Sequence, residues 1–383
     1  MNTHYDVIIA AAGPGGSTCA LSLEQSGLKV LLLDKDRFPR DKICGDAINS
    51  KVNRVLRKIN PGLEKDLQAF IPKAKVTGVT VHGPNWDSLK ISRGLTCYCI
   101  KRVDFDHWLF QKASQSANLT VLENTTLKKV YSDDSGITIE TSLGREFHSK
   151  IIVGCDGAHS VVAKQLAGFK MNRFHYGGAV RQYYQNIKGL DEHVIEIFLL
   201  KGYLPGYFWI FPVSGHQANV GFGMLSHTIA KRKIDLKKYL HEIIHDVPQL
   251  ARRFEPAIAL DEIKGFGLPL GSQKCRISGN RFLLCGDAAS LIDPITGEGI
   301  ETAMESGQLA ADQIQKAFVT NDFSASALQA YDQKVYKRMW GTFRKHYYTQ
   351  RIVGEKIGLV NTLIRIGNIP FVHKKIQTWF SKG

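Results

Sequence analysis

The sequence predicts an α/β protein in which a Rossmann-type nucleotide-binding domain carries a mixed β-sheet insertion and is followed by a helical segment. Residues 5–34 have the order strand, glycine turn, helix, strand and acid. Residues 281–307 repeat a strand, a glycine-rich loop and a helix, while 173–275 are mostly strand-like. With 383 residues, 44% hydrophobic and 22% charged, the chain has a globular composition and is long enough for two domains.

The first unit begins the chain and is complete. Its expected elements are a buried strand Tyr5–Ala10, a helix Ser17–Ser26 ended by Gly27, and a second strand Leu28–Leu33 closed by Asp34. The acid follows the glycine turn by about twenty residues, where a dinucleotide-binding unit places the carboxylate that binds a ribose hydroxyl. We therefore expect an adenine dinucleotide here. The alternative is an ordinary small-residue turn with a strand-end carboxylate.

The glycine turn, Ala10-Ala-Ala-Gly-Pro-Gly-Gly16, departs from the G-x-G-x-x-G pattern at one position. Gly13 and Gly16 fill the second and third glycine positions, but Ala11 occupies the first. A Cβ there costs about 1–2 kcal/mol if the backbone is left-handed, which corresponds to roughly ten-fold weaker cofactor binding. The candidate contacts from this unit are Ala12, Gly13, Gly15, Gly16, Asp34 and Lys35.

The second unit, RFLLCGDAASLIDPITGEGIETAMESG (Arg281–Gly307), indicates which dinucleotide binds. After the strand Phe282–Cys285, Asp287 can accept a hydrogen bond from the ribityl chain of a flavin. Gly297 and Gly299 precede a helix from about Ile300, whose free N–H groups suit the anionic edge of a reduced flavin. An NAD-only protein does not need this unit, so we predict FAD. The alternative role for Asp287 is to cap the helix, but its distance from the helix start favours contact with the ribityl chain.

Two shorter stretches complete the set of motifs. VGCDGAHSVVAKQL (153–166) is a strand end, a turn with Asp156 and a helix start. In CIKRVDFDHWL (99–109), Arg102 precedes a helix that buries apolar side chains at helical spacing. Arg102 there can pair with a phosphate or the ribityl edge. By residue type alone, a surface arginine at a helix N-terminus is the simpler interpretation.

These four motifs, in this order, resemble the flavoprotein fold of para-hydroxybenzoate hydroxylase and its relatives over about residues 5–310. Two further stretches, DRFPRDKICGDAIN (36–49) and YFWIFP (207–212), are similar to signatures of the geranylgeranyl reductase family. The TGEGI and AMESG pieces of the second unit are similar to that family too.

The resemblance implies a role for each motif residue. Asp34 would contact the adenosine ribose, and Arg102 and Asp287 would hold the ribityl-phosphate part. Arg40 and Lys42 would lie beside the flavin, with Cys44 and Gly45 close to its isoalloxazine ring. Gly297, Gly299 and Ile300 would lie under the pyrimidine edge, and Tyr207 and Trp209 would face the substrate from a strand that Pro212 ends. The residues expected to be catalytic are Cys44, Tyr207 and Trp209; a core strand and a buried structural thiol are the alternatives.

The same resemblance divides the chain into three parts. The expected FAD-binding domain is discontinuous, and a β-sheet substrate domain is inserted into it. Residues Ile234–Leu250 of the insertion have the pattern of one amphipathic helix. The expected boundaries are 1–74, 95–172 and 276–325 for the FAD-binding domain, 75–94 and 173–275 for the substrate domain, and 326–383 for a basic helical C-terminal segment.

The expected function is that of an FAD-dependent oxidoreductase that reduces C=C bonds of an isoprenoid or other lipid-like substrate by hydride transfer from reduced flavin. The sequence contains one evident dinucleotide loop, so the electron donor is expected to be external, either NAD(P)H or a reduced redox protein. The alternative is an FAD-dependent monooxygenase or halogenase acting on an aromatic or polyketide-like substrate. The halogenase stretch W-x-W-x-I-P is absent, and YFWIFP is the nearest piece. Tyr207 and His175 are conceivable proton donors.

Charge and cysteine usage limit the partners. The net charge is +15, and residues 331–383 contain eleven Lys and Arg against two acids. Such a segment can meet an anionic membrane or an acidic partner. The sequence contains no signature of a nucleic-acid-binding protein, so we expect no nucleic-acid partner. Seven scattered cysteines predict neither a disulfide framework nor a metal site, and we expect a cytoplasmic protein, with peripheral membrane attachment as a hypothesis.

The attachment hypothesis comes from the last fifty residues. They carry an apolar helical stripe, basic flanks and terminal aromatics, which are Ile352, Val353, Ile357, Val360, Ile364 and Ile366, then Lys356, Arg365, Lys374, Lys375 and Lys382, then Trp379 and Phe380. This pattern is typical of a helix that lies at an anionic bilayer surface. The alternative is that the stripe packs on the FAD-binding domain.

Overall fold

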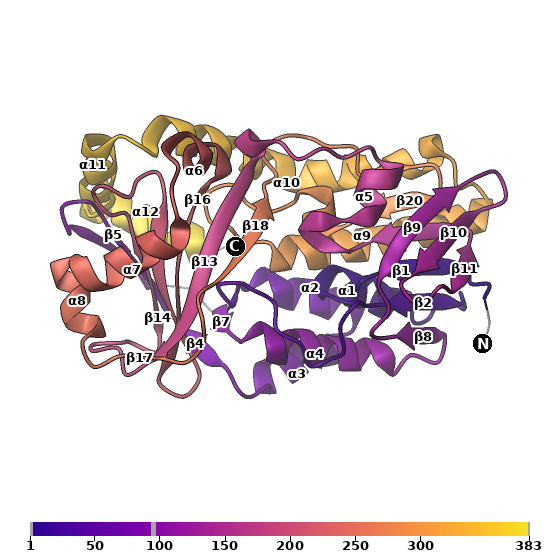
Figure 1. Cartoon of the computed structure of the whole chain (residues 1–383), viewed down its shortest axis with the longest axis horizontal. Helices are drawn as coiled ribbons and strands as arrows, with labels where there is room; N and C mark the ends of the chain where they lie inside the picture. The colour runs from indigo at the N-terminus through magenta and orange to yellow at the C-terminus, as the bar shows by residue number, and fades with distance from the viewer. Residues whose placement is uncertain (1–2, 93–96, 382–383) are drawn as a thin grey trace.

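A computed structural model describes residues 3–92 and 97–381, with side chains as far as Thr378. The molecule is elongated (Figure 1). A six-stranded sheet lies toward the end that holds the N-terminus, and an eight-stranded sheet lies toward the other end. The α/β fold class predicted from the sequence is confirmed.

The six-stranded sheet has the order β19-β20-β12-β1-β2-β8 and is parallel except at β19. Its central strands are short apolar runs that are buried throughout, as expected for a parallel sheet covered on both faces. Helices α1 (Pro14–Ser22) and α9 (Ile300–Thr320) pack closely together beside it. The strands are β1 (Val7–Ala10), β2 (Val30–Leu33), β8 (Leu119–Leu122), β12 (Ile151–Gly154), β19 (Ser278–Gly279) and β20 (Phe282–Leu284).

Smaller elements surround this sheet. Two three-stranded sheets have the orders β11-β10-β9 and β3-β7-β4. Their strands are β9 (Leu127–Ser132), β10 (Ile137–Thr141), β11 (Glu146–Ser149), β3 (Ala47–Ile48), β4 (Ala74–Val76) and β7 (Cys97–Cys99). The helices are α2 (Lys51–Ile59), α3 (Pro61–Ala69), α4 (Arg102–Ser114), α5 (Val161–Leu166) and the 3₁₀ turns η1 (Gly157–His159), η2 (Arg173–His175) and η3 (Gly286–Ala289).

The eight-stranded sheet follows the order β17-β13-β16-β15-β14-β5-β6, and β18 also pairs with β13. One face is covered by helices whose apolar side chains share a core with strand residues such as Phe208 and Phe222. The strands are β5 (Gly78–His82), β6 (Ser88–Ile91), β13 (Tyr176–Gln185), β14 (Val194–Phe198), β15 (Tyr207–Val213), β16 (Gln217–Leu225), β17 (Ile258–Ala259) and β18 (Lys264–Pro269). The helices are α6 (Ser226–Arg232), α7 (Leu236–Asp246) and α8 (Pro248–Phe254).

The chain ends in three helices, α10 (Ala325–Val353), α11 (Ile357–Gly367) and α12 (Pro370–Ser381). Part of the predicted apolar stripe is buried, since Val360 and Ile364 pack against Leu204. Leu204 precedes β15, so this part of the stripe packs beside the eight-stranded sheet and not on the six-stranded one. Ile352 and Ile366 are exposed. The side chains of Trp379, Phe380 and Lys382 lie outside the described residues.

Three sequence expectations about elements were wrong in detail. Helix α1 begins three residues earlier than expected, at Pro14, and ends at Ser22. The expected single helix Ile234–Leu250 is two helices, because Pro248 forces an extended backbone on Val247. Pro212 does not end its strand; β14 pairs β15 only as far as Ile210, so a residue without an N–H is tolerated beyond that point.

Candidate active site

The glycine turn connects β1 to the N-terminus of α1. Gly13 precedes the helix, and Pro14 occupies its first turn, where a missing N–H costs nothing. A Cβ on Gly16 would lie 1.9 Å from the carbonyl oxygen of Ala11, so only glycine fits there. Ala11 has φ +77°, which is the left-handed conformation that the pattern's first glycine normally supplies. The turn therefore has glycine geometry with one alanine in it.

Asp34 ties this turn to the end of β2. Its carboxylate accepts hydrogen bonds from the backbone N–H groups of Ala12 (2.8 Å) and Asp36 (2.9 Å). The side chain is buried, and burial raises the pKa of Asp34. It borders the main cavity of the molecule, as a ribose-binding carboxylate in a dinucleotide site must.

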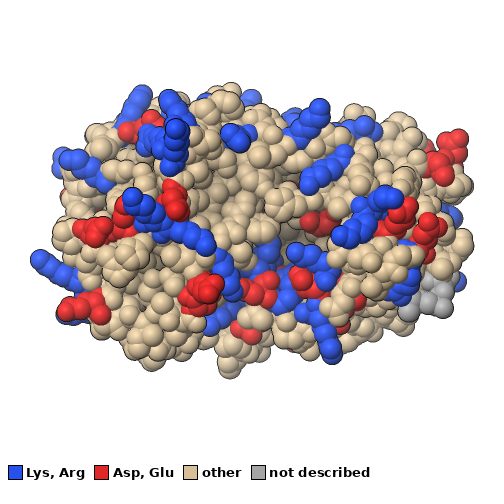
Figure 2. Space-filling model, viewed as in Figure 1, with Lys and Arg blue, Asp and Glu red and all other residues tan. Residues whose placement is uncertain are grey.

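The main cavity has a volume of about 660 Å³ and is lined by both large sheets and the loops between them. Figure 2 shows a hollow in the middle of one face, with Lys, Arg, Asp and Glu side chains around it. Of the cofactor-binding and catalytic residues predicted from the sequence, only Ala12 and Gly16 do not line the cavity. Those that line it are Gly13, Gly15, Asp34, Lys35, Arg40, Cys44, Gly45, Arg102, Asp156, Tyr207, Trp209, Asp287, Gly297, Gly299 and Ile300.

Cationic side chains gather at the start of α4. Arg102 is buried, contrary to the surface position that its residue type favours, and pairs with Asp106 through two hydrogen bonds of 2.7 Å. Arg40 donates a third, also 2.7 Å. Although burial opposes it, these two guanidinium groups hold the pKa of Asp106 below its usual value. Two cations share one carboxylate, so the cluster of Arg40, Arg102 and Asp106 retains a net positive charge beside the cavity.

Lys42 adds a cation that forms no ion pair with the described residues, although the Asp287 carboxylate attracts it from a distance. Its Nζ lies 3.2 Å from the ring centroid of Phe266, and no hydrogen bond or ion pair reaches it from the residues that the structure describes. Burial lowers the pKa of Lys42 to about 8. A half-buried cation without an ion-pair partner beside a cavity fits an anionic ligand. The resemblance placed Lys42 beside the flavin. Only the structure shows that no ion pair to Lys42 comes from the described residues.

The second glycine unit forms the opposite wall. Gly286 (φ +55°) and Gly297 (φ +71°) both adopt the left-handed conformation, and a Cβ on Gly297 would lie 2.9 Å from the hydroxyl of Tyr207. Gly299 precedes the first turn of α9, so Asp287 is not the cap of that helix. Free N–H groups at the start of a 21-residue helix give this wall the positive dipole end that an anionic ring edge requires.

Asp156 lines the cavity but is already engaged. Its carboxylate accepts hydrogen bonds from the Ser160 hydroxyl (2.5 Å) and from the backbone N–H groups of Val161 (2.6 Å) and Val162 (3.3 Å). These contacts fix the start of α5. Lys35, by contrast, is largely exposed and forms a 3.9 Å ion pair with Asp36.

Aromatic side chains of β15 form the wall that faces the glycine units. Tyr207 donates a hydrogen bond to the carbonyl of Thr296 (3.0 Å), and the indole N–H of Trp209 donates to Asn219 Oδ1 (3.0 Å). A Cβ on Gly45 would lie 3.1 Å from the ring of Phe211. His175 does not line the cavity; its Nδ1 lies 2.8 Å from the Ser272 hydroxyl.

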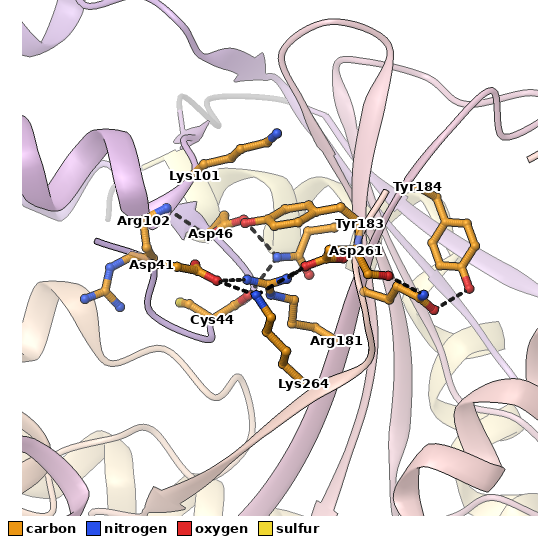
Figure 3. A network of polar contacts seen from close by, with 12 residues as sticks. Asp41, Cys44, Asp46, Lys101, Arg102, Arg181, Tyr183, Tyr184, Asp261 and Lys264 are labelled. Atoms are coloured by element: carbon orange, nitrogen blue, oxygen red, sulfur yellow. Dashed lines mark hydrogen bonds and ion pairs between the residues drawn. The ribbon is translucent and has the colours of Figure 1, made fainter. Parts of the chain in front are cut away.

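A buried polar hub behind Cys44 was missed by the sequence analysis (Figure 3). Asp46 accepts hydrogen bonds from the Tyr183 hydroxyl (2.6 Å), Asn219 Nδ2 (2.8 Å) and the backbone N–H of Arg102 (3.2 Å). Asn219 also donates to the carbonyl of Cys44 (2.7 Å). Asp46 is fully buried, and burial raises its pKa to about 6. A buried asparagine in the apolar run of β16 was the available signal.

A second polar cluster joins the loop before Cys44 to β13 and β18. Arg181 is 1% exposed, and it pairs with Asp41 (2.7 Å) and, closely, with Asp261. Lys264 lies 3.4 Å from the same Asp41 carboxylate (Figure 3). These ion pairs hold the loop that carries Cys44 against the eight-stranded sheet. The sequence gives no sign of them, because their partners lie far apart along the chain.

The cavity fits FAD on its own geometry. Close-packed glycine turns, the buried Asp34 carboxylate, the helix N-terminus of α9 and the unpaired Lys42 match a ligand with ribose, phosphate and an anionic ring edge. Within residues 3–92 and 97–381, no cluster of His, Cys, Asp and Glu could hold a metal ion.

Comparison with known proteins identifies the family. Residues 4–345 match the sequence model of the FAD binding domain family. Digeranylgeranylglycerophospholipid reductase 2 of Methanococcoides burtonii is 30% identical over 342 residues, which cover 87% of this chain and 80% of that protein. The chain belongs to the geranylgeranyl reductase family of FAD-dependent oxidoreductases. The resemblance predicted from the motifs is confirmed, and FAD is the cofactor.

Other relatives of this geranylgeranyl reductase family member support the same grouping. Menaquinone reductase of Mycolicibacterium smegmatis is 26% identical over 95% of this chain and 86% of that protein. A geranylgeranyl bacteriochlorophyll reductase-like structure from Thermoplasma acidophilum superposes with a TM-score of 0.83 and 25% identity, covering 95% of this chain and 91% of that one. A flavin-dependent brominase (TM-score 0.81, 22% identity, 99% and 94% coverage) shares the fold alone.

Proposed function

We propose that this enzyme reduces C=C bonds of an isoprenoid or other lipid-like substrate. The observation that carries the proposal is the aromatic wall of Tyr207, Trp209 and Phe211, which lines the cavity and meets the second glycine unit where Tyr207 donates to the Thr296 carbonyl. An apolar, aromatic wall suits a hydrocarbon chain, and it offers few polar groups to orient a polar substrate. Relatives named for geranylgeranyl lipids add support.

In this proposal, the residues around the cavity divide into two groups. Gly13, Gly15 and Asp34 hold the adenosine and pyrophosphate part of FAD, with Arg40, Lys42 and Arg102 neutralising its phosphates. Asp287 and the Gly297–Ile300 turn hold the ribityl chain and the ring edge. When bound, reduced FAD supplies a hydride from N5.

The substrate side of the cavity belongs to Cys44, Tyr207 and Trp209. The polar hub of Asp46 and Asn219 fixes the Cys44 carbonyl and the Trp209 indole with hydrogen bonds of 2.7 and 3.0 Å. A wall held in this way keeps its shape and excludes water from the space where the double bond would lie. The proton that completes the reduction must come from a group that can be resupplied from solvent.

The electron donor and the membrane are further parts of the proposal. No second dinucleotide turn accompanies the one at Gly13–Gly16, so an external donor, NAD(P)H or a reduced redox protein, supplies the electrons. No helix in the described part of the chain is long and apolar enough to cross a membrane. The exposed apolar and basic side chains of α10–α12 support peripheral attachment to an anionic surface, from which a lipid substrate could be drawn.

An anaerobic single-turnover experiment tests the reaction. The FAD-loaded enzyme is reduced with dithionite, freed of excess reductant and mixed with digeranylgeranylglycerophospholipid in detergent. We expect the flavin to reoxidise without oxygen, and mass analysis to show the lipid two hydrogens heavier. Reoxidation only on adding oxygen, with a product containing oxygen or halogen, would favour the monooxygenase or halogenase alternative.

A further inference from the structure

A second cavity lies behind the wall that Gly297 and Gly299 form. It has a volume of about 330 Å³ and is enclosed by α2, α9, α10 and the loop before α9. Its lining is mostly charged, so it can hold water. The lining residues are Lys51, Arg54, Lys58, Asp293, Glu298, Glu301, Thr302, Glu305, Arg338, Met339, Thr342 and Phe343.

Among the described residues, Glu298 alone lines both this cavity and the main one. It stands between Gly297 and Gly299, in the loop that contacts Tyr207. Hydrogen bonds fix this loop: the N–H of Asp293 donates to the carbonyl of Glu298 (2.9 Å), and the N–H of Glu298 donates to the Thr296 hydroxyl (3.2 Å). The backbone of Glu298 is therefore fixed between a polar, water-compatible space and the aromatic cavity.

The surroundings of Glu298 favour its protonated form. Glu298 is exposed overall, and its side chain lines both cavities, where protein atoms crowd around the carboxyl group. That crowding, together with the Asp293 carboxylate, raises the pKa of Glu298, while Lys51 and Asn49 oppose the rise. Asn49 Nδ2 lies 3.3 Å from Glu298 Oε2. The charged and titratable groups that act on it or feel its charge are Lys51 of α2, Cys97 of β7, Tyr207 of β15, Asp293 of its own loop, Glu301 of α9 and His346 of α10.

We propose that Glu298 carries protons from the second cavity into the main cavity, and the proposal rests on the reductase function proposed above. Saturation of a C=C bond adds a hydride, with its electron pair, to one carbon and a proton to the other. The reduced cofactor provides the hydride. The carboxyl group of Glu298 provides the proton, becomes a carboxylate, and regains a proton from water in the second cavity. An acid whose pKa is raised above the usual carboxyl value is suited to this step.

Other acids near the cavity lack this path. Asp46 also has a raised pKa, but it is fully buried and held by three hydrogen bonds, so its carboxyl group does not contact water. Burial and the neighbouring Glu298 and Asp293 raise the pKa of Tyr207, and its hydroxyl already donates to Thr296. Glu301 lines the second cavity but not the main one. Of the acids in the described part of the chain, Glu298 is the one that lines both cavities, so it can pass a proton from one to the other.

The test compares Glu298→Gln with Glu301→Gln in the FAD-loaded enzyme. The first measurement needs no substrate: the midpoint potential of the flavin is titrated from pH 5 to 9. A carboxyl group beside the ring adds an inflection to the pH dependence, because its proton affinity changes with the charge of the cofactor. We expect the inflection in the parent enzyme and in Glu301→Gln, and its loss in Glu298→Gln. Identical curves for all three proteins would overturn the assignment.

The second measurement is the anaerobic single turnover with digeranylgeranylglycerophospholipid. Removing a general acid lowers the rate by about 100-fold, and we expect this for Glu298→Gln, with Glu301→Gln near the parent rate. Glu298→Asp should restore part of the rate, and Glu298→Ala replaces the glutamine variant in both measurements if the latter does not bind FAD. A parent enzyme that never turns over this lipid, but shows the Glu298 inflection, would refute the proposed substrate and leave the Glu298 assignment standing. An unchanged rate in Glu298→Gln would refute the proton path.

Discussion

At the scale of single residues, Ala11 shows how one Cβ is tolerated in a nucleotide turn. Its φ of +77° is a conformation that glycine adopts without cost and alanine does not. The turn nevertheless keeps its shape, because Gly16 lets helix α1 start against the Ala11 carbonyl and because Asp34 holds the next N–H. Neighbouring contacts therefore compensate for the strain at Ala11.

Replacing Ala11 by glycine should relieve that strain. The left-handed conformation costs alanine about 1–2 kcal/mol, of which the greater freedom of glycine in the unfolded chain offsets about 0.4–1 kcal/mol. We expect Ala11→Gly to raise the thermal midpoint by about 1–2 °C and to tighten FAD binding, by up to about ten-fold. Ala12→Gly, at a neighbour without positive φ, should lower stability instead. Calorimetry and FAD titration measure both; equal or weaker FAD binding in Ala11→Gly would contradict the argument.

The buried Asp46 predicts an unusual pH dependence. Between about pH 3.9, the usual aspartate pKa, and its own pKa of about 6, the folded chain holds a proton there that the unfolded chain has lost. Stability from this group is therefore complete at low pH and is lost as pH rises to 6. Across this window, we expect the free energy of unfolding of the parent protein to fall by on the order of 2–3 kcal/mol relative to that of Asp46→Asn.

Asp41 provides a control of opposite sign for Asp46. Although burial opposes it, Arg181 and Lys264 lower the pKa of Asp41, so its contribution is present at higher pH and is lost on acidification. Thermal melts between pH 2 and 7 should therefore show the parent losing stability relative to Asp46→Asn above about pH 3.9, and losing stability relative to Asp41→Asn below it. Parallel curves for the parent and Asp46→Asn would mean that Asp46 titrates normally.

At the scale of elements, the sequence predicts the parts whose signals are local. The β1–α1–β2 unit, the β20 strand and the start of α9 at Ile300 follow from apolar runs, glycines and one acid that are close together in the chain. The polar hub does not, because Asp46, Tyr183 and Asn219 come from three separate segments. Hydrogen bonds between segments have no periodicity in the sequence, so no sequence pattern marks Asp46.

Strand β15 provides the test of the aromatic wall. Trp209→Phe keeps most of the apolar side chain but removes the N–H that Asn219 Oδ1 accepts. An unpaired buried amide costs about 1–3 kcal/mol, and Asn219 is then free to release the Cys44 carbonyl. We expect turnover to fall about ten-fold while FAD absorbance of the purified protein is unchanged. Phe208→Leu, on the opposite face of β15, should lower stability without this loss of rate. Loss of flavin in Trp209→Phe would instead make Trp209 a structural core residue.

At the scale of the whole molecule, the C-terminal helices bind to the end of the eight-stranded sheet and leave an apolar edge exposed. Val360 and Ile364 are buried against Leu204, and Asn368 Nδ2 donates to the carbonyl of Ser88 (2.8 Å). Figure 1 shows α11 at the end of the molecule far from the N-terminus. Gln350 of α10 and Pro205 line the main cavity, so the attachment point of these helices is also a boundary of the substrate space.

The exposed part of this segment should bind anionic membranes. Leu363, Ile366, Ile369 and Phe371 are 46%, 43%, 50% and 68% exposed, and the segment that carries them has a large excess of Lys and Arg. Each basic residue near an anionic surface contributes about 1 kcal/mol, and inserted apolar side chains add to this. We expect the parent protein to sediment with phosphatidylglycerol vesicles at low salt and to remain in the supernatant with phosphatidylcholine vesicles.

Point variants test this better than truncation, because a chain cut near Gln350 would lose the packing of Val360 and Ile364 as well as the exposed edge. The combined variant Ile366→Ser, Ile369→Ser and Phe371→Ser changes only exposed side chains, so the fold should be retained while vesicle binding weakens at least about ten-fold. Val319→Ser is the matched control, since Val319 is 88% exposed on α9, outside this segment. If the combined variant binds as the parent does, or if Val319→Ser weakens binding equally, these helices serve only to close the substrate end of the fold.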